Sequence, residues 1–309
     1  MQSDPHLKTD LSRFLQRQPN ITLAKILPLP IYRRYLSFLG FFYFGKNTFE
    51  RRNVSRSLKY VLGKRVDGIT FQSILWKTYF GIFEHYLEKM INAHKSLSRM
   101  KVFLNERISF SGKDCLDQAI DNEHGCILVT GHFGAVEYIP LYLASNDYRT
   151  SMIVRFKTEA LRQVLVDKSK AVDLELIDAE SPNVIFKALH AIKNGRILIT
   201  LCDEIHSWRP CSRFQAQLFG SRIPKDRTLD ILYKRSKAPA CFGILRRDNN
   251  GYDFTVRSLA DGKMDCSICE SSWKLLETVI YKHPEQWYQW PNFFPEMSRY
   301  ISAMKCYES

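Results

Sequence analysis

Residues 126–140 read Cys-Ile-Leu-Val-Thr-Gly-His-Phe-Gly-Ala-Val-Glu-Tyr-Ile-Pro. An apolar run of strand length is followed by a turn with glycines at 131 and 134, and then by the start of a helical pattern. A strand that turns tightly into a helix is typical of a βαβ unit. In parallel α/β sheets, ligands bind beyond the carboxyl ends of the strands, so His132 lies where a functional residue is expected.

The chain after about residue 120 repeats this alternation of short β-rich runs and helical stretches. The order predicts an α/β fold with a largely parallel central sheet flanked by helices. The Asn250-Gly251 dipeptide predicts one antiparallel hairpin at the sheet edge. The expected strands are 126–130, 151–154, 196–201, 240–245 and 252–256, and the expected helices are about 135–146, 158–170, 182–193, 226–236 and 271–282.

Residues 1–110 differ from the rest in pattern and charge. They show helical periodicity and contain 19 Lys and Arg against 7 Asp and Glu, whereas the whole chain has 45 against 32. Such a basic region attracts an anionic membrane leaflet, an acidic carrier protein or nucleic acid, but we find no nucleic-acid-binding motif beside it. We expect 1–110 to be a helical, basic, membrane-proximal platform and 111–309 an α/β body, together one integrated domain.

The apolar segment from residue 21 to 44 is interrupted by prolines and cations, and its clean run, residues 35–44, is about half of the roughly 20 residues that span a bilayer. We therefore expect no transmembrane helix. Its Phe and Tyr residues with flanking Lys and Arg suit either an interfacial anchor or a helix packed on the core, and both alternatives stay open. The first ten residues do not resemble a secretory signal.

The eight cysteines are scattered, several within apolar runs, which favours buried thiols in a reducing compartment. Cys266 and Cys269 alone have ligand-like spacing, and a structural zinc site would need a second pair. We expect no metal and no cofactor.

His132 and Glu137 form the one H-x4-[D/E] match in the chain, and about 0.8 such matches are expected by chance. In an unbroken helix the two side chains would point about 140° apart, so pairing requires His132 to lie in a non-helical lead-in. A paired His and carboxylate act as a general base and its orienter. No G-x-S-x-G elbow occurs, so the acceptor itself would be the nucleophile. A core histidine without catalytic function is the alternative.

Gly131-His-Phe-Gly-Ala-Val-Glu137 resembles the Gly-His-Phe-Gly-x-x-Glu signature of the bacterial lipid A biosynthesis late acyltransferases, the lauroyl/myristoyl acyltransferase family. The resemblance runs from about residue 25 to 295. Two positions depart from the family: Ala135-Val136 replaces Asn-Trp, and Glu204 replaces Gln. Further matching positions are Arg155, Asp203, Phe219-Gly220, Ala238-Pro239, Arg246 and the closing segment His283-Pro-Glu-Gln-Trp-Tyr-Gln-Trp290.

This resemblance implies an enzyme that moves a fatty acyl group from an acyl carrier protein or coenzyme A thioester to a hydroxyl of a lipid acceptor, often an acylated sugar, at the cytoplasmic face of the inner membrane. His132 would be the base and Glu137 its orienter. Arg155 would bind an anion or form a surface ion pair. The residues expected to bind substrate are Gly131, Phe133, Gly134, Arg155, Asp203 and Glu204.

Trp287 and Trp290 are expected to be packing residues rather than the lining of an acyl groove.

Two other functions remain possible for the chain: a catalytically inactive relative that binds lipid or carrier protein, and a hydrolase that uses the same base on water. Neither involves nucleic acid.

Overall fold

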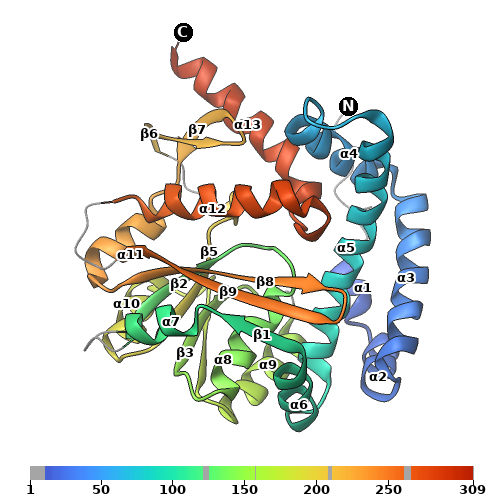
Figure 1. The fold of residues 1–309 in the computed structure, drawn as a ribbon, viewed down its shortest axis with the longest axis vertical. Helices are drawn as coiled ribbons and strands as arrows, with labels where there is room; N and C mark the ends of the chain where they lie inside the picture. Colours follow the sequence, from blue (N-terminus) through green and yellow to red (C-terminus); the bar gives the residue numbers. More distant parts are fainter. Residues whose placement is uncertain (1–10, 121–124, 157, 208–210, 261–265, 309) are drawn as a thin grey trace.

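The computed structural model describes residues 11–120, 125–156, 158–207, 211–260 and 266–308, and its central feature is a seven-stranded sheet with helices on both faces (Figure 1). The strand order is β1-β9-β8-β2-β5-β3-β4, and every neighbouring pair is parallel except β8–β9. The predicted α/β fold with a largely parallel sheet is therefore confirmed. The strands are β1 (Ile108–Ser111), β2 (Cys126–Thr130), β3 (Thr150–Val154), β4 (Leu174–Asp178), β5 (Ile197–Leu201), β8 (Ala240–Asp248) and β9 (Gly251–Ala260).

All five expected strands are present, and the hairpin at Asn250-Gly251 joins β8 to β9. The prediction that this hairpin forms the sheet edge is wrong. β1 pairs in parallel with β9 from Ile108 to Ser111 and so covers that edge. The sequence interpretation also missed β4 and a separate two-stranded sheet of β6 (Cys211–Leu218) and β7 (Ser221–Lys225).

The middle of the sheet is the core of the molecule. All five residues of β2 are fully buried, and the first four of β5 are buried. A central strand covered by helices on both faces needs such a continuous apolar run. The helices that follow the first strand are α7 (Lys113–Ile120), α8 (Ile139–Ser145), α9 (Glu159–Lys170), α10 (Val184–Lys193), α11 (Thr228–Ser236), α12 (Ile268–Lys282) and α13 (Trp290–Glu308).

Residues 11–107 are helical apart from short turns, as predicted. The longest of these helices, α5, begins after Asp67, whose carboxylate accepts hydrogen bonds from the backbone N–H groups of Ile69 and Thr70. α5 contacts the 3₁₀ helices η2 (Val136–Tyr138) and η4 (Pro284–Gln286), so it reaches the end of the sheet where the turn after β2 lies. The helices are α1 (Leu11–Leu15), α2 (Gln18–Ile26), α3 (Leu29–Lys46), α4 (Thr48–Leu62), α5 (Gly68–His94) and α6 (Leu97–Arg107).

Helix α3 lies outside α5, with one face on the core and one face exposed (Figure 1). Its buried face consists of residues four apart, including Tyr32, Leu36 and Gly40, and a Cβ on Gly40 would lie 2.7 Å from the Phe83 ring. The exposed face includes Phe41, with 64% of its surface accessible. Both alternatives for this segment thus keep support: one face packs on the core, and the other is apolar and uncovered. Within the described part of the chain, no helix combines the length and apolar character that crossing a bilayer requires.

Candidate active site

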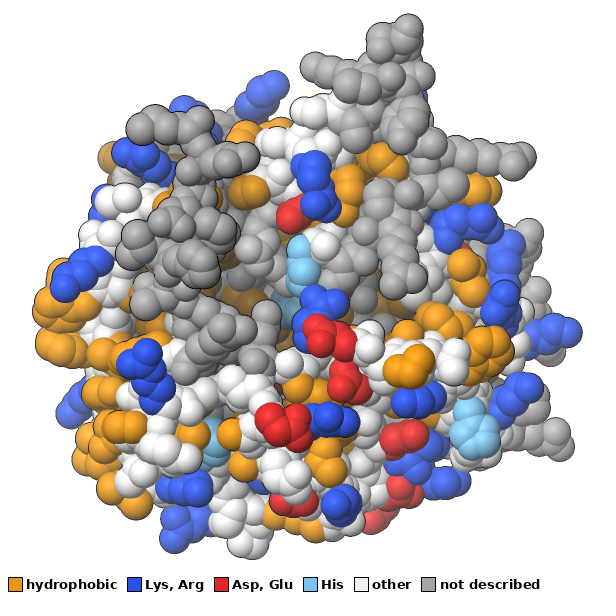
Figure 2. Space-filling model, turned by 180° about the vertical axis from the view of Figure 1, so that it is seen from behind, with side chains coloured by type: hydrophobic (Ala, Val, Ile, Leu, Met, Phe, Trp, Pro, Cys, Tyr) orange, Lys and Arg blue, Asp and Glu red, His pale blue; other side chains and the backbone are white. Residues whose placement is uncertain are grey.

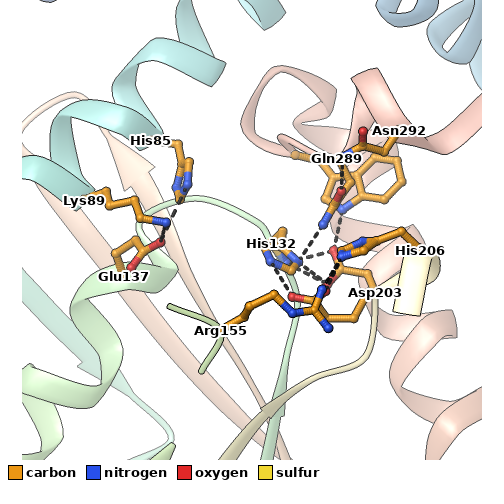
Figure 3. A network of polar contacts seen from close by, with 11 residues as sticks. His85, Lys89, His132, Glu137, Arg155, Asp203, His206, Gln289 and Asn292 are labelled. Carbon is orange, nitrogen blue, oxygen red and sulfur yellow. Dashed lines mark hydrogen bonds and ion pairs between the residues drawn. The ribbon is translucent and has the colours of Figure 1, made fainter. Parts of the chain in front are cut away.

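The site forms where the central strands β2 and β5 end. These strands are parallel neighbours, and Thr130 pairs with Leu201. His132 and Asp203 each follow two residues later, so the sheet register brings them side by side although 71 residues separate them in sequence. Figure 3 shows the two side chains facing each other.

Asp203 orients the imidazole of His132. The Nδ1 of His132 lies 2.8 Å from Oδ1 of Asp203, and the backbone N–H of His132 donates to the same carboxylate, 2.8 Å from Oδ2. Asp203 is fully buried. A buried carboxylate beside Nδ1 keeps the proton on that nitrogen and leaves Nε2 as the position for proton transfer.

Glu204 occupies the other side of the ring. Its Oε1 lies 3.2 Å from Nε2 of His132, and its Oε2 lies 3.2 Å from Nε2 of His206. Arg155 Nη1 is 2.9 Å from the same His206 nitrogen. The carboxylate of Glu204 therefore connects the predicted base to a pair of basic side chains.

These carboxylates change the titration of the ring. Burial lowers the pKa of His132, but the charge and hydrogen bonds of Asp203 and Glu204 outweigh burial and raise it to about 10. Burial likewise opposes ionisation of Glu204, whereas its contacts with His132, His206 and Arg155 lower its pKa to about 2. The two carboxylates therefore both favour the protonated form of the imidazole.

The predicted contact between His132 and Glu137 is wrong. Glu137 Oε1 lies 3.7 Å from Nε2 of His85 and 3.8 Å from Nζ of Lys89, both on α5. No hydrogen bond or ion pair joins Glu137 to His132, two residues that the structure describes, and Figure 3 shows them in separate clusters. The reason is the turn, because η2 directs the Glu137 side chain towards α5 and Asn92 Nδ2 donates to its carbonyl.

The glycines of the turn have separate functions. Gly134 has φ +58°, and a Cβ there would lie 2.0 Å from the carbonyl oxygen of Leu245, so only glycine fits. At Gly131 a Cβ would lie 2.8 Å from the Leu276 side chain. Both residues thus shape the turn, and their predicted contact with substrate stays a prediction.

The backbone N–H groups of residues 132–135 in the turn are engaged. His132 N–H donates to Asp203, and the next three donate to backbone carbonyls of Gly131, Gln286 and Leu245. Acyl-transfer enzymes commonly stabilise an oxyanion with free backbone N–H groups. These four N–H groups are therefore not available for that purpose in the structure.

Two of the expected substrate-binding residues differ in their surroundings. Phe133 is fully buried and forms an isolated β-bridge with Trp287, and its predicted contact with substrate stays a prediction. Arg155 is partly exposed and also lies 3.5 Å from Glu180, so it does form the surface ion pair that was one alternative. Its anion-binding function stays a prediction.

The closing segment supplies site residues that sequence reasoning missed. Nε2 of Gln289 lies 3.0 Å from Nδ1 of His132, and the ring of Tyr288 meets the His132 ring edge-on at 5.0 Å between centroids. Trp287 and Trp290 are fully buried, which confirms packing, but the indole N–H of Trp287 also donates to Asp203. The sequence did contain a signal for them, because a glutamine precedes each tryptophan of the closing segment.

A buried ion pair supports the turn from beneath. The guanidinium of Arg247 donates to both carboxylate oxygens of Glu88, at 2.7 and 2.8 Å, and to the carbonyl of Gly134 at 2.8 Å. Glu88 is 1% exposed. Arg247 lies on β8 and thereby links α5 to the turn that follows β2.

Comparison with known proteins identifies the family of the chain. The family model described as bacterial lipid A biosynthesis acyltransferase matches residues 20–291. No curated protein matches the chain. The match includes the turn of His132, the loop of Asp203 and the whole closing segment His283–Trp290 that contacts them. The chain therefore belongs to the bacterial lipid A biosynthesis acyltransferase family, and this membership implies acyl transfer to a lipid acceptor.

Proposed function

We propose that this protein transfers an acyl group from a thioester of acyl carrier protein or coenzyme A to a hydroxyl of a lipid acceptor, with His132 as general base and Asp203 as its orienter. The observation that carries this proposal is the 2.8 Å contact between Nδ1 of His132 and a fully buried carboxylate. This arrangement leaves Nε2 to accept a proton from the acceptor hydroxyl.

The reaction needs one base and no protein nucleophile. The acceptor hydroxyl gives its proton to Nε2 of His132 while its oxygen attacks the thioester carbonyl. The tetrahedral intermediate then collapses, the carbon–sulfur bond breaks, and the imidazolium returns the proton to the leaving thiolate. Asp203 stabilises the imidazolium in between.

Glu204 occupies the place of the reacting atoms and has to move before they bind. Its two oxygens lie on Nε2 of His132 and on His206, where an attacking oxygen and a carbonyl oxygen would lie. When Glu204 leaves, the pKa of His132 falls, because one of the two carboxylates that raise it is removed. A larger fraction of the imidazole is then neutral and able to accept a proton. Substrate binding thus prepares the base.

Arg155 and His206 are the candidate donors to the oxyanion. They lie 2.9 Å apart beside Glu204, and the backbone N–H groups of residues 132–135 are already engaged. Their charge also suits a phosphate of coenzyme A, of the carrier protein's prosthetic group or of the acceptor. We assign Arg155 the anion-binding function.

The exposed apolar side chains of α3, the start of α4 and α5 are proposed to contact the membrane. On the left of Figure 2, where the half-turn brings α3, hydrophobic side chains gather with Lys and Arg between them. Aromatic rings at the acyl boundary and cations at the phosphates match an anionic leaflet. The surface consists of Ile31, Phe38, Phe41, Phe42, Phe49, Ile69, Trp76 and Phe80, with Arg34, Lys46, Arg51, Arg52 and Lys77 nearby in the chain.

This surface fits peripheral binding at the cytoplasmic face of the inner membrane, where acyl thioesters and the lipid acceptor meet. Residues 1–110 would then be the membrane-proximal region and 111–309 the catalytic body of one integrated domain. The packing of α5 on η2 and η4 supports this arrangement, because it ties the helical region to the site.

The test supplies lauroyl-coenzyme A or lauroyl-acyl carrier protein with a lipid extract from cells that lack this protein, and follows products by mass spectrometry. The wild type should add one acyl unit to one lipid class, and His132→Ala should abolish the addition while the protein still binds vesicles. Asp203→Asn should reduce kcat by about 10³–10⁴-fold, because the amide no longer fixes the imidazole tautomer.

The two other functions predict different products. A hydrolase would release free lauric acid at the same rate with and without acceptor, and a catalytically inactive relative would consume no donor. Either result contradicts the proposal. The donor that supports the faster transfer decides between coenzyme A and carrier protein.

A further inference from the structure

The segment from Pro284 to Trp290 frames the catalytic turn from the opposite side of Asp203. Phe133 and Trp287 form a β-bridge, Tyr288 N–H donates to the carbonyl of His132, and Gly134 N–H donates to the carbonyl of Gln286. Bonds to the turn in both directions fix where this segment lies relative to His132.

Within this segment, Trp287 makes a direct contact with the orienting carboxylate. Its indole N–H donates to Oδ2 of Asp203 at 2.7 Å, and both side chains are fully buried. The backbone N–H of His132 also donates to this oxygen at 2.8 Å and lies 3.0 Å from Oδ1, and Oδ1 faces Nδ1 at 2.8 Å. Two donors on Oδ2 therefore set the rotation of the carboxylate about its χ2 bond, which is otherwise soft.

The indole ring itself cannot move freely. It packs edge-on against Trp290 with centroids 4.7 Å apart, and it also contacts Phe293 at 5.3 Å, Phe219 at 5.8 Å and Trp273 at 6.5 Å. A ring held on several sides presents its N–H at a fixed point. Hydrogen-bonded partners of this kind orient the groups that touch the reactants.

We propose that Trp287 is a positioning residue for the acyl transfer, which acts through Asp203 to aim the carboxylate at Nδ1 of His132. This inference rests on the proposed function. It assigns the tryptophan of the closing motif a chemical task in addition to packing, and it explains why the ring is placed with its N–H towards the site.

Trp290 offers a matched control. It is equally buried, it belongs to the same aromatic cluster, and its indole N–H donates at 2.7 Å to the carbonyl of Pro284 instead of to a catalytic group. Trp287→Phe and Trp290→Phe therefore each remove one buried N–H donor and a similar volume. Only the first removes a donor from Asp203.

Trp287→Phe should lower kcat by about 10–100-fold with little change in KM, as is typical for loss of an outer hydrogen-bond partner, whereas Trp290→Phe should lower kcat by less than about threefold. The pH profile should separate them too. Without the indole N–H, the full negative charge of the Asp203 carboxylate faces Nδ1 and holds the His132 proton more tightly, so the inflection of kcat/KM should move to higher pH in Trp287→Phe alone. Equal effects of the two substitutions on kcat and on the pH profile would overturn the proposal.

A second measurement does not depend on acyl-transfer activity. In wild-type protein with ¹⁵N-labelled tryptophan, the indole N–H signal of Trp287 can be assigned by replacing each of the other four tryptophans by Phe. That signal should shift with pH in step with titration of the His132 ring. A signal that stays constant through this titration contradicts the proposal, even if acyl transfer itself is absent.

Discussion

The carboxylate of Glu137 lies 3.7 Å from Nε2 of His85, so the acidic residue of the H-x4-E motif contacts a histidine other than the motif's own. His85 stacks on the ring of Tyr288 with centroids 3.5 Å apart and an interplanar angle of 14°, and Tyr288 in turn meets the ring of His132. Glu137 therefore reaches the base only through two intervening side chains.

This relationship predicts different effects for the two carboxylates. Glu137→Gln should lower kcat at least tenfold less than Asp203→Asn, because the amide keeps the size and position of the side chain beside His85, whereas Asp203 contacts Nδ1 of His132 directly. Steady-state kinetics of acyl transfer provide the measurement. In a double-mutant cycle, Glu137→Gln and His85→Phe should be non-additive, since both act through Tyr288. A larger loss in Glu137→Gln than in Asp203→Asn would show that Glu137 orients the base after all.

Replacing Glu204 by Gln, the residue common in the family, should change the pH dependence of activity. The variant loses one carboxylate that raises the pKa of His132, so the base becomes neutral at lower pH. The inflection of kcat/KM should lie near the His132 pKa of about 10 in the wild type and should move to lower pH in the variant. An unchanged inflection in pH–rate profiles from pH 6 to about 10.5 would contradict the contact with Nε2.

The same substitution should change stability in a defined pH window. The His132 pKa is raised from 6.5, so its stabilising contribution is complete below pH 6.5 and is lost as pH rises through about 10. The Glu204 pKa is lowered from 4.5, so its contribution is complete above pH 4.5 and is lost as pH falls through about 2. Urea unfolding should therefore show the largest destabilisation by Glu204→Gln between pH 4.5 and 6.5.

Gly134→Ala should reduce stability and activity by more than the strain of a positive φ alone would. The alanine Cβ would lie 2.0 Å from the carbonyl oxygen of Leu245, in addition to the strain of φ +58°. Gly220 is a matched control, because it has φ +80° but no atom within 4 Å of a Cβ. We expect Gly220→Ala to cost about 1 kcal/mol and to keep activity, and Gly134→Ala to cost more than about 3 kcal/mol and to abolish acyl transfer. Thermal unfolding and activity assays decide, and equal losses would exclude the close approach.

Phe41→Ser should weaken membrane binding. Phe41 is 64% exposed on α3, and moving its ring into the acyl boundary contributes about 1.5–3 kcal/mol, or roughly tenfold or more in the partition constant. Phe186→Ser on α10 is the control, because that ring is 66% exposed on a helix outside the proposed surface. Sedimentation with vesicles of phosphatidylethanolamine and phosphatidylglycerol measures both. Equal binding of the two variants would place the membrane contact elsewhere.

The elements predicted from sequence are those whose pattern is local. β2 and β5 are continuous apolar runs, and such runs identify buried parallel strands without tertiary information. β1 was missed because its four residues directly follow a helix, and β4 because its sequence Leu-Glu-Leu-Ile-Asp alternates only briefly. Both lie at the sheet edges, where burial is incomplete and the apolar signal is weak.

The location of the site was predictable, but the partner of the base was not. His132 follows a central strand, and Asp203 follows another, so the rule for parallel sheets placed both at one edge. The choice of Glu137 rested on closeness in sequence. The sign of φ at Gly134 and the direction of η2 turn that side chain towards α5, and neither follows from residue spacing. Strand register, which pairs Thr130 with Leu201, makes Asp203 the neighbour.

The β-bridge between Phe133 and Trp287 also sets an order for biosynthesis. The ribosome makes the histidine turn about 150 residues before the segment that clamps it, and domains generally fold as units during or after synthesis. A nascent chain can complete its central strands while this turn still lacks its frame. The turn of His132 can therefore take its final form only after the segment from Pro284 to Trp290 has been made and has folded against it.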